Sequence, residues 1–309
     1  MALWTPDKIT TALWLDAADA DTITLNGSNV SQWDDKSGNS RHATQGSSTA
    51  QPAYVTGGSN GLNTIRFDGT NDLLTSPQSI NIQSAQTFVV GKTISGAIGI
   101  VQRRSTSSSN DRYYMGGNIG YYVGSTAVSV NVTADLAIHC LRSLSNAQAA
   151  WTNGTANGSG TDSNTFTHTT FPIGGGTNGK NVFGNVEVCE VLHFSTPVDD
   201  TTRQKTEGYL AHKWGLAANL PAEHPYKDAA PIIPSLFGTI TDKDGNPAER
   251  RITVLDSAGH CVATDTSDPV TGAYSIEMPN DDPYTLVFDG EPDRNAQVFA
   301  NVIPGEPPA

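Results

Sequence analysis

The chain has 309 residues, with 31 Asp or Glu against 18 Lys or Arg and a formal net charge of -13. This acidity argues against nucleic acid or an anionic bilayer as a partner, because both are bound through a Lys/Arg surface. Only 16% of the residues are charged, and 30 glycines and 17 prolines favour short strands and turns over helices. The length allows one large and one small domain.

No stretch approaches the ~20 apolar residues needed to span a bilayer. Residues 1–6 also lack the basic and long apolar regions of a signal peptide. We therefore expect folding in the cytoplasm without membrane insertion. The three cysteines, Cys140, Cys189 and Cys261, are odd in number, far apart and without CxxC spacing. We interpret them as small buried hydrophobic residues outside any disulfide framework.

The first part of the chain is predicted to form short strands. Leucines alternate with their neighbours in residues 11–16, as in a strand with one buried face. Residues 30–39 suit a strand that runs into a Ser-Gly-Asn turn, and residues 64–74 suit two strands around an Asp-Gly turn. Short apolar runs recur over residues 87–152, which is typical of a sandwich or barrel. Residues 153–179 hold few large aliphatic side chains, so we expect a long loop with one short strand.

A strand and a helix follow. Residues 184–194 are β-rich, and residues 199–215 then change to a period of 3.6, with an aspartate at the start to cap the helix. Leu210 and Trp214 lie four residues apart on one face, and Gly215 suits a left-handed end. If the Trp214 ring is buried against the strands, Trp214→Ala should destabilise the domain by about 3 to 5 kcal/mol.

Five segments carry a family resemblance. They are residues 13–16 (LWLD), 33–38 (WDDKSG), 65–69 (IRFDG), 185–191 (NVEVCEV) and 207–216 (EGYLAHKWGL). Together they resemble the laminin-G-like, concanavalin A-like jelly-roll modules of phage and bacterial surface proteins, over about residues 2–228. The resemblance implies two packed antiparallel sheets, frequent sugar or protein binding at loop edges and, in some members, a calcium ion. It does not imply one ligand.

A second domain follows a Pro-rich linker at residues 229–234. Residues 235–309 alternate strands with Asp-Gly and Ala-Gly turns, which predicts a small β-sandwich. Residues 238–247 (GTITDKDGNP) and 272–274 (GAY) resemble the carboxypeptidase regulatory-like, transthyretin-like module of Ig type, which implies a spacer or adhesion unit. The predicted fold class is therefore all-β, with a jelly-roll sandwich carrying one C-terminal helix at residues 1–228 and then this Ig-like sandwich.

The jelly-roll resemblance raises the question of glycoside hydrolysis. Retaining glycosidases need two carboxyl groups about 5 Å apart on one face. Glu187 and Glu190 are three residues apart, and side chains alternate along a strand, so we expect them on opposite faces. Cys189 and Val191 occupy the positions that would match Glu187 and cannot do acid-base chemistry. We also find no Gly-x-Ser-x-Gly elbow, Walker loop or HExxH motif, and therefore predict no catalytic residue and no enzyme activity.

Four aspartates are candidate calcium ligands: Asp16, Asp34, Asp35 and Asp68. They lie at loop edges within the segments that carry the resemblance, and carboxylate oxygens are what Ca²⁺ prefers. The alternative, which we favour, is that each aspartate caps a turn or pairs with a nearby lysine or arginine.

The densest aromatic group indicates a candidate sugar-binding surface. It comprises Tyr113, Tyr114, Tyr121 and Tyr122, with Asn118 nearby to hydrogen-bond a ligand. Consecutive tyrosines place one ring on each face of a strand, so one ring of each pair is available outside the core. The alternative, left open at this point, is that the outer rings cover a contact between subunits.

Together these features predict a non-enzymatic phage virion structural protein, as a capsid decoration, tail tip or tail fibre component with an adhesion or glycan-binding role. Two extracellular-type folds without an evident secretion signal or disulfides fit a protein that assembles in the host cytoplasm and ends on the particle surface. The expected partners are other virion proteins or further copies of the chain, and a host-surface glycan. The alternative is a bacterial surface lectin-like module, and the third hypothesis is a divergent glycoside hydrolase.

Overall fold

The structure is a computed structural model of the chain. It describes residues 3–95, 101–103, 112–115, 121–124, 126–129, 135–163, 165, 167–177, 182–278, 282–290 and 297–305. The chain divides into two compact units: a first domain, Thr5–Ala230, and a second domain, Pro231–Ala309 together with Met1–Trp4.

The first domain is built mainly from strands. They are β1 (Leu13–Asp16), β2 (Ile23–Asn26), β3 (Asn29–Trp33), β4 (Ala43–Thr44), β5 (Ala53–Ser59), β6 (Leu62–Asp68), β7 (Leu74–Ser76), β8 (Ile80–Asn81), β9 (Ser84–Ser95), β10 (Val101–Arg103), β11 (Arg112–Met115), β12 (Tyr121–Gly124), β13 (Thr126–Ser129), β14 (Ala137–Leu144), β15 (Ala147–Thr152), β16 (Thr155–Thr161), β17 (Thr167–His168), β18 (Phe171–Ile173), β19 (Gly175–Thr177), β20 (Val182–Phe183) and β21 (Asn185–Phe194). Its helices are α1 (Asp200–Lys213) and the 3-10 turns η1 (Pro6–Lys8), η2 (Ala20–Thr22), η3 (Ser48–Ala50) and η4 (Ala217–Asn219).

Strand β21 is at the centre of the sandwich. It pairs antiparallel with β1, β6 and β9, and β9 continues through β14 and β15 to β16. A second run of pairings leads from β4 through β7, β18, β10, β11 and β12 to β13. Trp33, Phe67 and Phe171 are fully buried in the core that these strands enclose.

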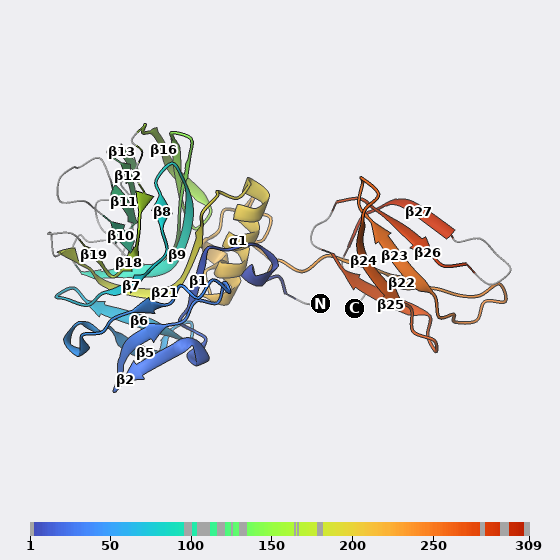
Figure 1. Ribbon diagram of the computed structural model, residues 1–309, viewed down its shortest axis with the longest axis horizontal. Coiled ribbons are helices and arrows are strands. Elements are labelled where there is room, and N and C mark those ends of the chain that lie inside the picture. The colour runs from blue at the N-terminus through green and yellow to red at the C-terminus, as the bar shows by residue number, and fades with distance from the viewer. Residues whose placement is uncertain are drawn as a thin grey trace. The chain divides into compact units, whose positions relative to one another are not determined.

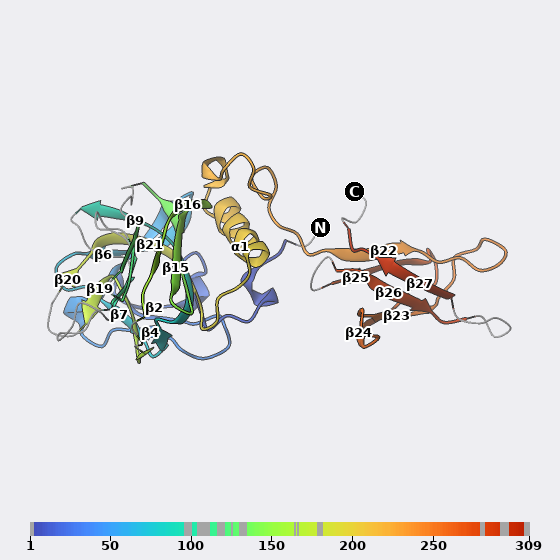
Figure 2. The ribbon, with the colours of Figure 1, turned by 90° about the horizontal axis from the view of Figure 1, so that it is seen from above.

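Helix α1 covers the other face of the layer that contains β9, β14 and β21 (Figures 1 and 2). The Asp199 carboxylate accepts a hydrogen bond from the Thr202 N–H at 2.6 Å and caps the start of the helix. The helix ends before Gly215, which has a φ of +72°. Leu210 and Trp214 are buried in a second apolar cluster beneath the helix, as the sequence predicts.

The all-β prediction with one C-terminal helix is confirmed, but the prediction of a loop at residues 153–179 is wrong. That segment contributes β16, β17, β18 and β19. β16 pairs along its whole length with β15, although its residues are exposed or half-buried. A strand without a buried face shows no apolar alternation, so its sequence reads as a loop.

The second domain is a small sandwich of two sheets. Its strands are β22 (Ser235–Thr239), β23 (Arg251–Leu255), β24 (Cys261–Thr266), β25 (Ala273–Glu277), β26 (Tyr284–Phe288) and β27 (Gln297–Val302). β22 pairs with β25, and the second sheet has the order β24-β23-β26-β27. Leu236, Ile252, Val254 and Leu286 form the centre of its core.

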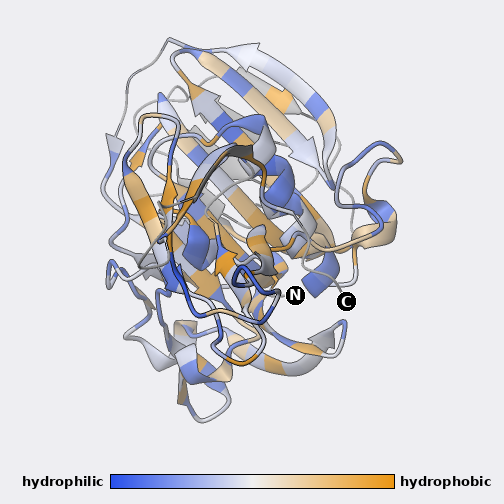
Figure 3. Cartoon of the chain, turned by 90° about the vertical axis from the view of Figure 1, so that its right-hand side faces the viewer, coloured by the Kyte–Doolittle hydropathy of each residue, from blue (hydrophilic) through white to orange (hydrophobic). Residues whose placement is uncertain are grey.

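Apolar and polar residues alternate along many of the strands, as Figure 3 shows by hydropathy. This is the pattern of sheets that bury one face. Within the described ranges, no helix is both long and apolar enough to cross a bilayer.

Candidate functional site

The two glutamates of β21 lie on the same face of the sheet. In the register between β21 and β9, Val188 pairs with Gly91 and Glu190 with Val90, so Cys189 is an extra, bulged residue. The bulge shifts the alternation by one position. The expectation that Glu187 and Glu190 point to opposite faces is therefore wrong, and both face the side that α1 covers.

Glu190 is enclosed by hydrogen-bond donors. Its Oε1 accepts from the Trp14 indole N–H at 2.8 Å and from the Tyr209 hydroxyl at 3.0 Å. Its Oε2 accepts from the Lys213 ammonium at 2.7 Å and from the Trp214 indole N–H at 2.8 Å. The carboxylate thus receives two donors on each oxygen, from β1 and from the helix.

This arrangement closes Glu190 to any substrate. The residue is 1% exposed, and burial raises its pKa while the nearby Lys213 ammonium opposes that shift. Burial also raises the pKa of Tyr209, so its hydroxyl remains a donor to Glu190. A general acid needs contact with the leaving group, and a carboxylate that is 1% exposed and holds two protein donors on each oxygen has no surface open to one.

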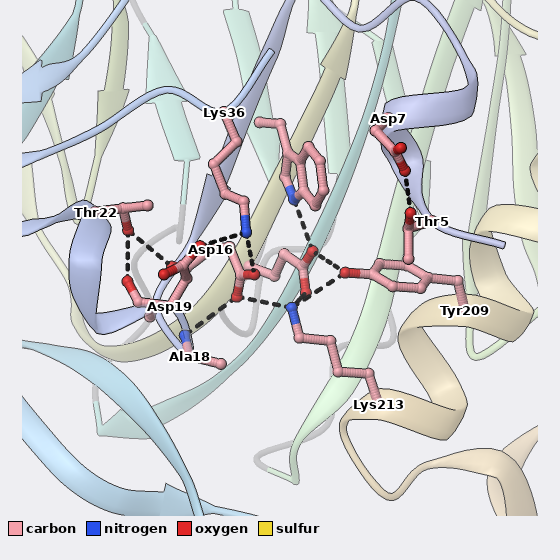
Figure 4. A network of polar contacts seen from close by, with 12 residues as sticks. Thr5, Asp7, Asp16, Ala18, Asp19, Thr22, Lys36, Tyr209 and Lys213 are labelled. Carbon is pink, nitrogen blue, oxygen red and sulfur yellow. Dashed lines mark hydrogen bonds and ion pairs between the residues drawn. The ribbon is translucent and has the colours of Figure 1, made fainter. Parts of the chain in front are cut away.

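A network of charges continues outward from Glu190 (Figure 4). The Lys213 ammonium also lies 2.7 Å from the Asp16 carboxylate, which is 3.1 Å from the Lys36 ammonium. Lys36 in turn lies 2.6 Å from Asp19 and 4.6 Å from the centre of the Trp14 ring. The two buried carboxylates of the network, Glu190 and Asp16, are therefore matched by two lysines, Lys213 and Lys36, as their burial requires.

Glu187 is also surrounded by hydrogen-bond donors and positive charges, which come from other residues. Its carboxylate accepts a hydrogen bond from the Ser59 hydroxyl at 3.0 Å and lies 2.6 Å from Arg66 and 3.3 Å from Lys92. Burial alone would raise the pKa of Glu187, but the hydrogen bonds from Arg66 and Ser59 hold it below its ordinary value. It is fully buried and ionised, so it is a structural anion.

The four candidate calcium ligands do not come together. Asp16 is bound by two lysines, as described above. The Asp35 carboxylate accepts from the backbone N–H groups of Trp14 at 3.0 Å and Arg41 at 3.0 Å, and Asp34 accepts from the Gln32 amide.

Asp68 completes the set by capping a turn, where its Oδ1 accepts from the Thr70 N–H at 2.7 Å. Within the part of the chain that the structure describes, no group of three or more His, Cys, Asp or Glu side chains could hold a metal ion. These contacts are the ion pairing and turn capping of the alternative that we favour from the sequence. Calcium binding by the four aspartates stays a prediction.

The predicted tyrosines lie on two neighbouring strands. Backbone pairing sets Tyr114 opposite Tyr122 and Tyr113 opposite Val123, in β11 and β12, while Tyr121 pairs with Ser129 of β13. The structure thus brings both tyrosine pairs to one part of the sheet. Asn118 lies outside the described residues, and sugar binding by this group stays a prediction.

A polar pocket opens near the end of β21. It has a volume of about 240 Å³ and is lined by Arg41, Pro77, Gln78, Ser79, Asn81, Ser84, Thr167 and Ser195. Arg41 is held in place by a hydrogen bond from its Nη1 to the backbone oxygen of Ala12 at 2.9 Å. Most of its described lining residues carry a hydroxyl or amide group that can form hydrogen bonds, and none of them is an Asp, Glu or His.

The residues that surround Glu190 could be singled out from the sequence, but their contact with one another could not. Trp14, Glu190 and Lys213 lie in three of the segments that carry the family resemblance, yet their spacing along the chain gives no hint of contact. Only the pairing of β1 with β21, together with the docking of α1, joins them.

No protein-family model and no curated protein matches the chain. Among solved structures, it is similar to a Trypanosoma rangeli sialidase in complex with sialic acid, with 14% identity and a TM-score of 0.40 over 65% of this chain and 33% of the sialidase. It is similar to domain 4 of AbnA, a GH43 extracellular arabinanase from Geobacillus stearothermophilus in complex with arabinotriose, with 11% identity and a TM-score of 0.43 over 62% of this chain and 95% of that one.

A third similar structure is the botulinum neurotoxin serotype D binding domain, with 10% identity and a TM-score of 0.41 over 97% of this chain and 71% of that one. The chain spans about a third of the length of the sialidase that it matches. At these identities and TM-scores the likenesses are distant, and neither fold nor function is taken from them.

Proposed function

We propose that the chain is a non-enzymatic binding module of a virion, acting in capsid decoration, at the tail tip or in a tail fibre, with a glycan on the host surface as its ligand. The burial of Glu187 and Glu190 is the observation that supports a protein without enzyme activity. Both carboxylates are bound by donors of the protein itself, so we assign them a structural role. Because Glu187 and Glu190 are not accessible to a substrate, a binding function suits this β-sandwich better than glycoside hydrolysis.

The virion part rests on other support. Three of the sequence segments that resemble phage and bacterial surface modules, residues 13–16, 185–191 and 207–216, contribute residues to the buried cluster beneath α1. Of the three cysteines expected to be buried, Cys140 and Cys189 are buried free thiols, whereas Cys261 is exposed, so the expectation is wrong for Cys261. Burial raises the pKa of Cys140 and Cys189, so these two thiols are unreactive. Buried thiols of this kind fit a chain that folds in a reducing compartment.

Two measurements test the proposal. The full chain should bind an array of bacterial surface glycans, and it should release no reducing sugar from them. It should also co-sediment with particles when the phage that encodes it is purified. Reducing sugar released by the wild type and abolished in Glu187→Gln would establish a hydrolase instead.

A bacterial surface lectin remains the alternative and shares the binding half of the proposal. It differs in one observable result: a lectin would bind the same glycans but would not be found on purified particles. A chain that binds no glycan and sits on no particle would contradict both.

A further inference from the structure

The second domain has a large cleft along one side of its sandwich. It lies between β22 and β27, which are edge strands of the two different sheets. The cleft has a volume of about 540 Å³. Small-molecule sites in proteins have volumes of about 300 to 1,000 Å³, so the cleft can admit a ligand larger than a single ion.

Aromatic rings form one wall of this cleft. The Tyr274 and Phe288 rings meet edge to face with 5.7 Å between their centres, and Phe288 meets Phe299 in the same way at 5.6 Å. These contacts support Phe299, yet its side chain remains 52% exposed at the cleft. An exposed ring fixed by its neighbours is a ready stacking surface.

A glycine makes room for the innermost ring. A Cβ atom at Gly238 would lie 2.8 Å from the Tyr274 hydroxyl oxygen and 2.9 Å from a ring carbon. The Tyr274 ring therefore lies directly across β22, and any larger residue at position 238 would displace it. The glycine fixes the shape of the cleft wall.

Two polar groups in the cleft are not used by the fold. The hydroxyl of half-buried Tyr274 and the exposed carboxylate of Asp289 have no hydrogen-bond or ion-pair partner among the described residues. Burial raises the pKa of Tyr274, so its hydroxyl is a neutral donor and acceptor. Both groups can bond to a ligand without first breaking a contact to another described residue.

The charged side chains among the described residues that line the cleft are of both signs in equal number. Asp242 and Asp289 are negative, and Lys243 and Arg250 are positive. Asp242 is also committed to its turn, where its Oδ1 accepts from the backbone N–H of Asn246 at 2.9 Å. A rim without net charge gives no attraction for an ionic ligand and favours a neutral one.

We propose that this cleft binds an uncharged oligosaccharide. A sugar ring has an apolar C–H face, which can lie on the Phe299 ring, and hydroxyl groups at its edge, which can reach Tyr274 and Asp289. Apolar stacking beside a few placed polar groups is the general design of small-ligand sites. The inference rests on the proposed glycan-binding function and adds a site in the second domain, distinct from the tyrosines of β11 and β12.

The test measures the affinity of the full chain for neutral glycans. Wild-type protein is screened on immobilised neutral glucans, mannans, galactans and arabinans, and the best binder is titrated as a soluble oligosaccharide. The variants are Phe299→Ala, Tyr274→Phe and Asp289→Asn. Val270→Ser is the matched control, because Val270 is 78% exposed in the same domain and does not line the cleft.

Phe299→Ala should weaken binding about tenfold or more, as expected for an aromatic ring at the centre of a contact. Tyr274→Phe keeps the ring and should weaken binding about fivefold, through loss of one hydrogen bond. Val270→Ser should leave the affinity unchanged. Tyr274→Phe keeps the test decisive even where Phe299→Ala alters the fold, because it removes a single oxygen.

Three results would overturn the proposal, and each is distinct. Binding that survives the cleft variants but is lost in Tyr114→Ala or Tyr122→Ala would leave the proposed function intact and move the site to the first domain. Binding of peptides instead of glycans would make β22 and β27 edges for strand addition. No binding to any glycan would overturn the proposed function as well.

Discussion

Two regions of the molecule place polar groups beside aromatic rings, but they differ in whether other protein groups hydrogen-bond to those polar groups. Beneath α1, the carboxylate of Glu190 lies among aromatic rings and receives a donor from each of Trp14, Tyr209, Lys213 and Trp214. In the cleft of the second domain, the Tyr274 hydroxyl and the Asp289 carboxylate also lie near aromatic rings, but these two groups lack such partners among the described residues. Polar groups that the fold satisfies contribute to stability, whereas those left open can contribute to binding.

This comparison predicts a separation of effects. Substitutions beneath α1 should change the free energy of unfolding of the first domain, and substitutions in the cleft should change affinity with little effect on stability. Tryptophan fluorescence follows the first domain well, because Trp14, Trp33, Trp151 and Trp214 all belong to it and only Trp4 does not.

The largest effect is expected for Trp214→Ala. The ring is 1% exposed and its N–H donates to Glu190, so the variant loses a buried ring and leaves a buried acceptor short of a donor. The free energy of unfolding should fall by about 5 kcal/mol. Trp214→Phe, which keeps most of the ring, should lose about half as much. An unchanged denaturant midpoint for Trp214→Ala would show that α1 is dispensable.

Glu190→Gln should have the next largest effect. The amide keeps one acceptor but directs an NH₂ group at the Lys213 ammonium or an indole N–H. A loss of about 3 kcal/mol is expected, because one member of a buried ion pair is removed and donors are left facing each other. Glu223→Gln is the control, since Glu223 is exposed in the same domain. Equal midpoints for the two variants would contradict a structural role for Glu190.

Acid should weaken the first domain through its buried histidines. Burial lowers the pKa of His139 to about 4 and that of His193 to about 3. Each histidine is neutral in the folded state but gains a proton below about pH 6.5 when unfolded, so stability falls as the pH drops below that value. At pH 5 each histidine should lower the free energy of unfolding of the first domain by about 2 kcal/mol. Asp72 offsets part of this loss. Burial raises its pKa to about 6, so it binds a proton more tightly in the folded state and stabilises that state as the pH falls.

The measurement compares denaturant midpoints of the first domain at pH 7 and pH 5. His193→Gln should reduce the difference between the two midpoints, whereas His260→Gln should not, because His260 is exposed in the second domain. A first domain equally stable at both pH values would mean that the two histidines are protonated in the folded state.

The sequence was sufficient where local signals decide the structure. The cap before α1, the left-handed end at Gly215 and the buried face with Leu210 and Trp214 all follow from residues close together in the chain. It failed at Cys189, because a bulge depends on the register with β9, and a count of residues along one strand cannot show it. It also could not show that Asp16, a candidate calcium ligand, pairs with two lysines, because one of them, Lys213, is nearly 200 residues away along the chain.

The cleft of the second domain could not be predicted from sequence at all. Its walls come from five strands or their ends, and Gly238, Tyr274 and Phe299 are separated by long stretches of chain. Gly238 lies in a segment that resembles a known module, but nothing local indicates that Tyr274 will lie across it. Sites assembled from several strands become visible only when the sheets are placed.

The smallest effect on stability is expected for Phe299→Ala, and it is the sharpest test of the comparison. Trp214 and Phe299 are both aromatic and both contact other rings or apolar groups, but Phe299 is 52% exposed and lies on an edge strand. Its removal should lower the free energy of unfolding of the second domain by less than about 1 kcal/mol, because little area is lost from the core. Thermal unfolding of the full chain, followed by circular dichroism, measures this. A loss as large as that of Trp214→Ala would mean that Phe299 is a core residue, and the cleft would then be a packing defect instead of a binding site.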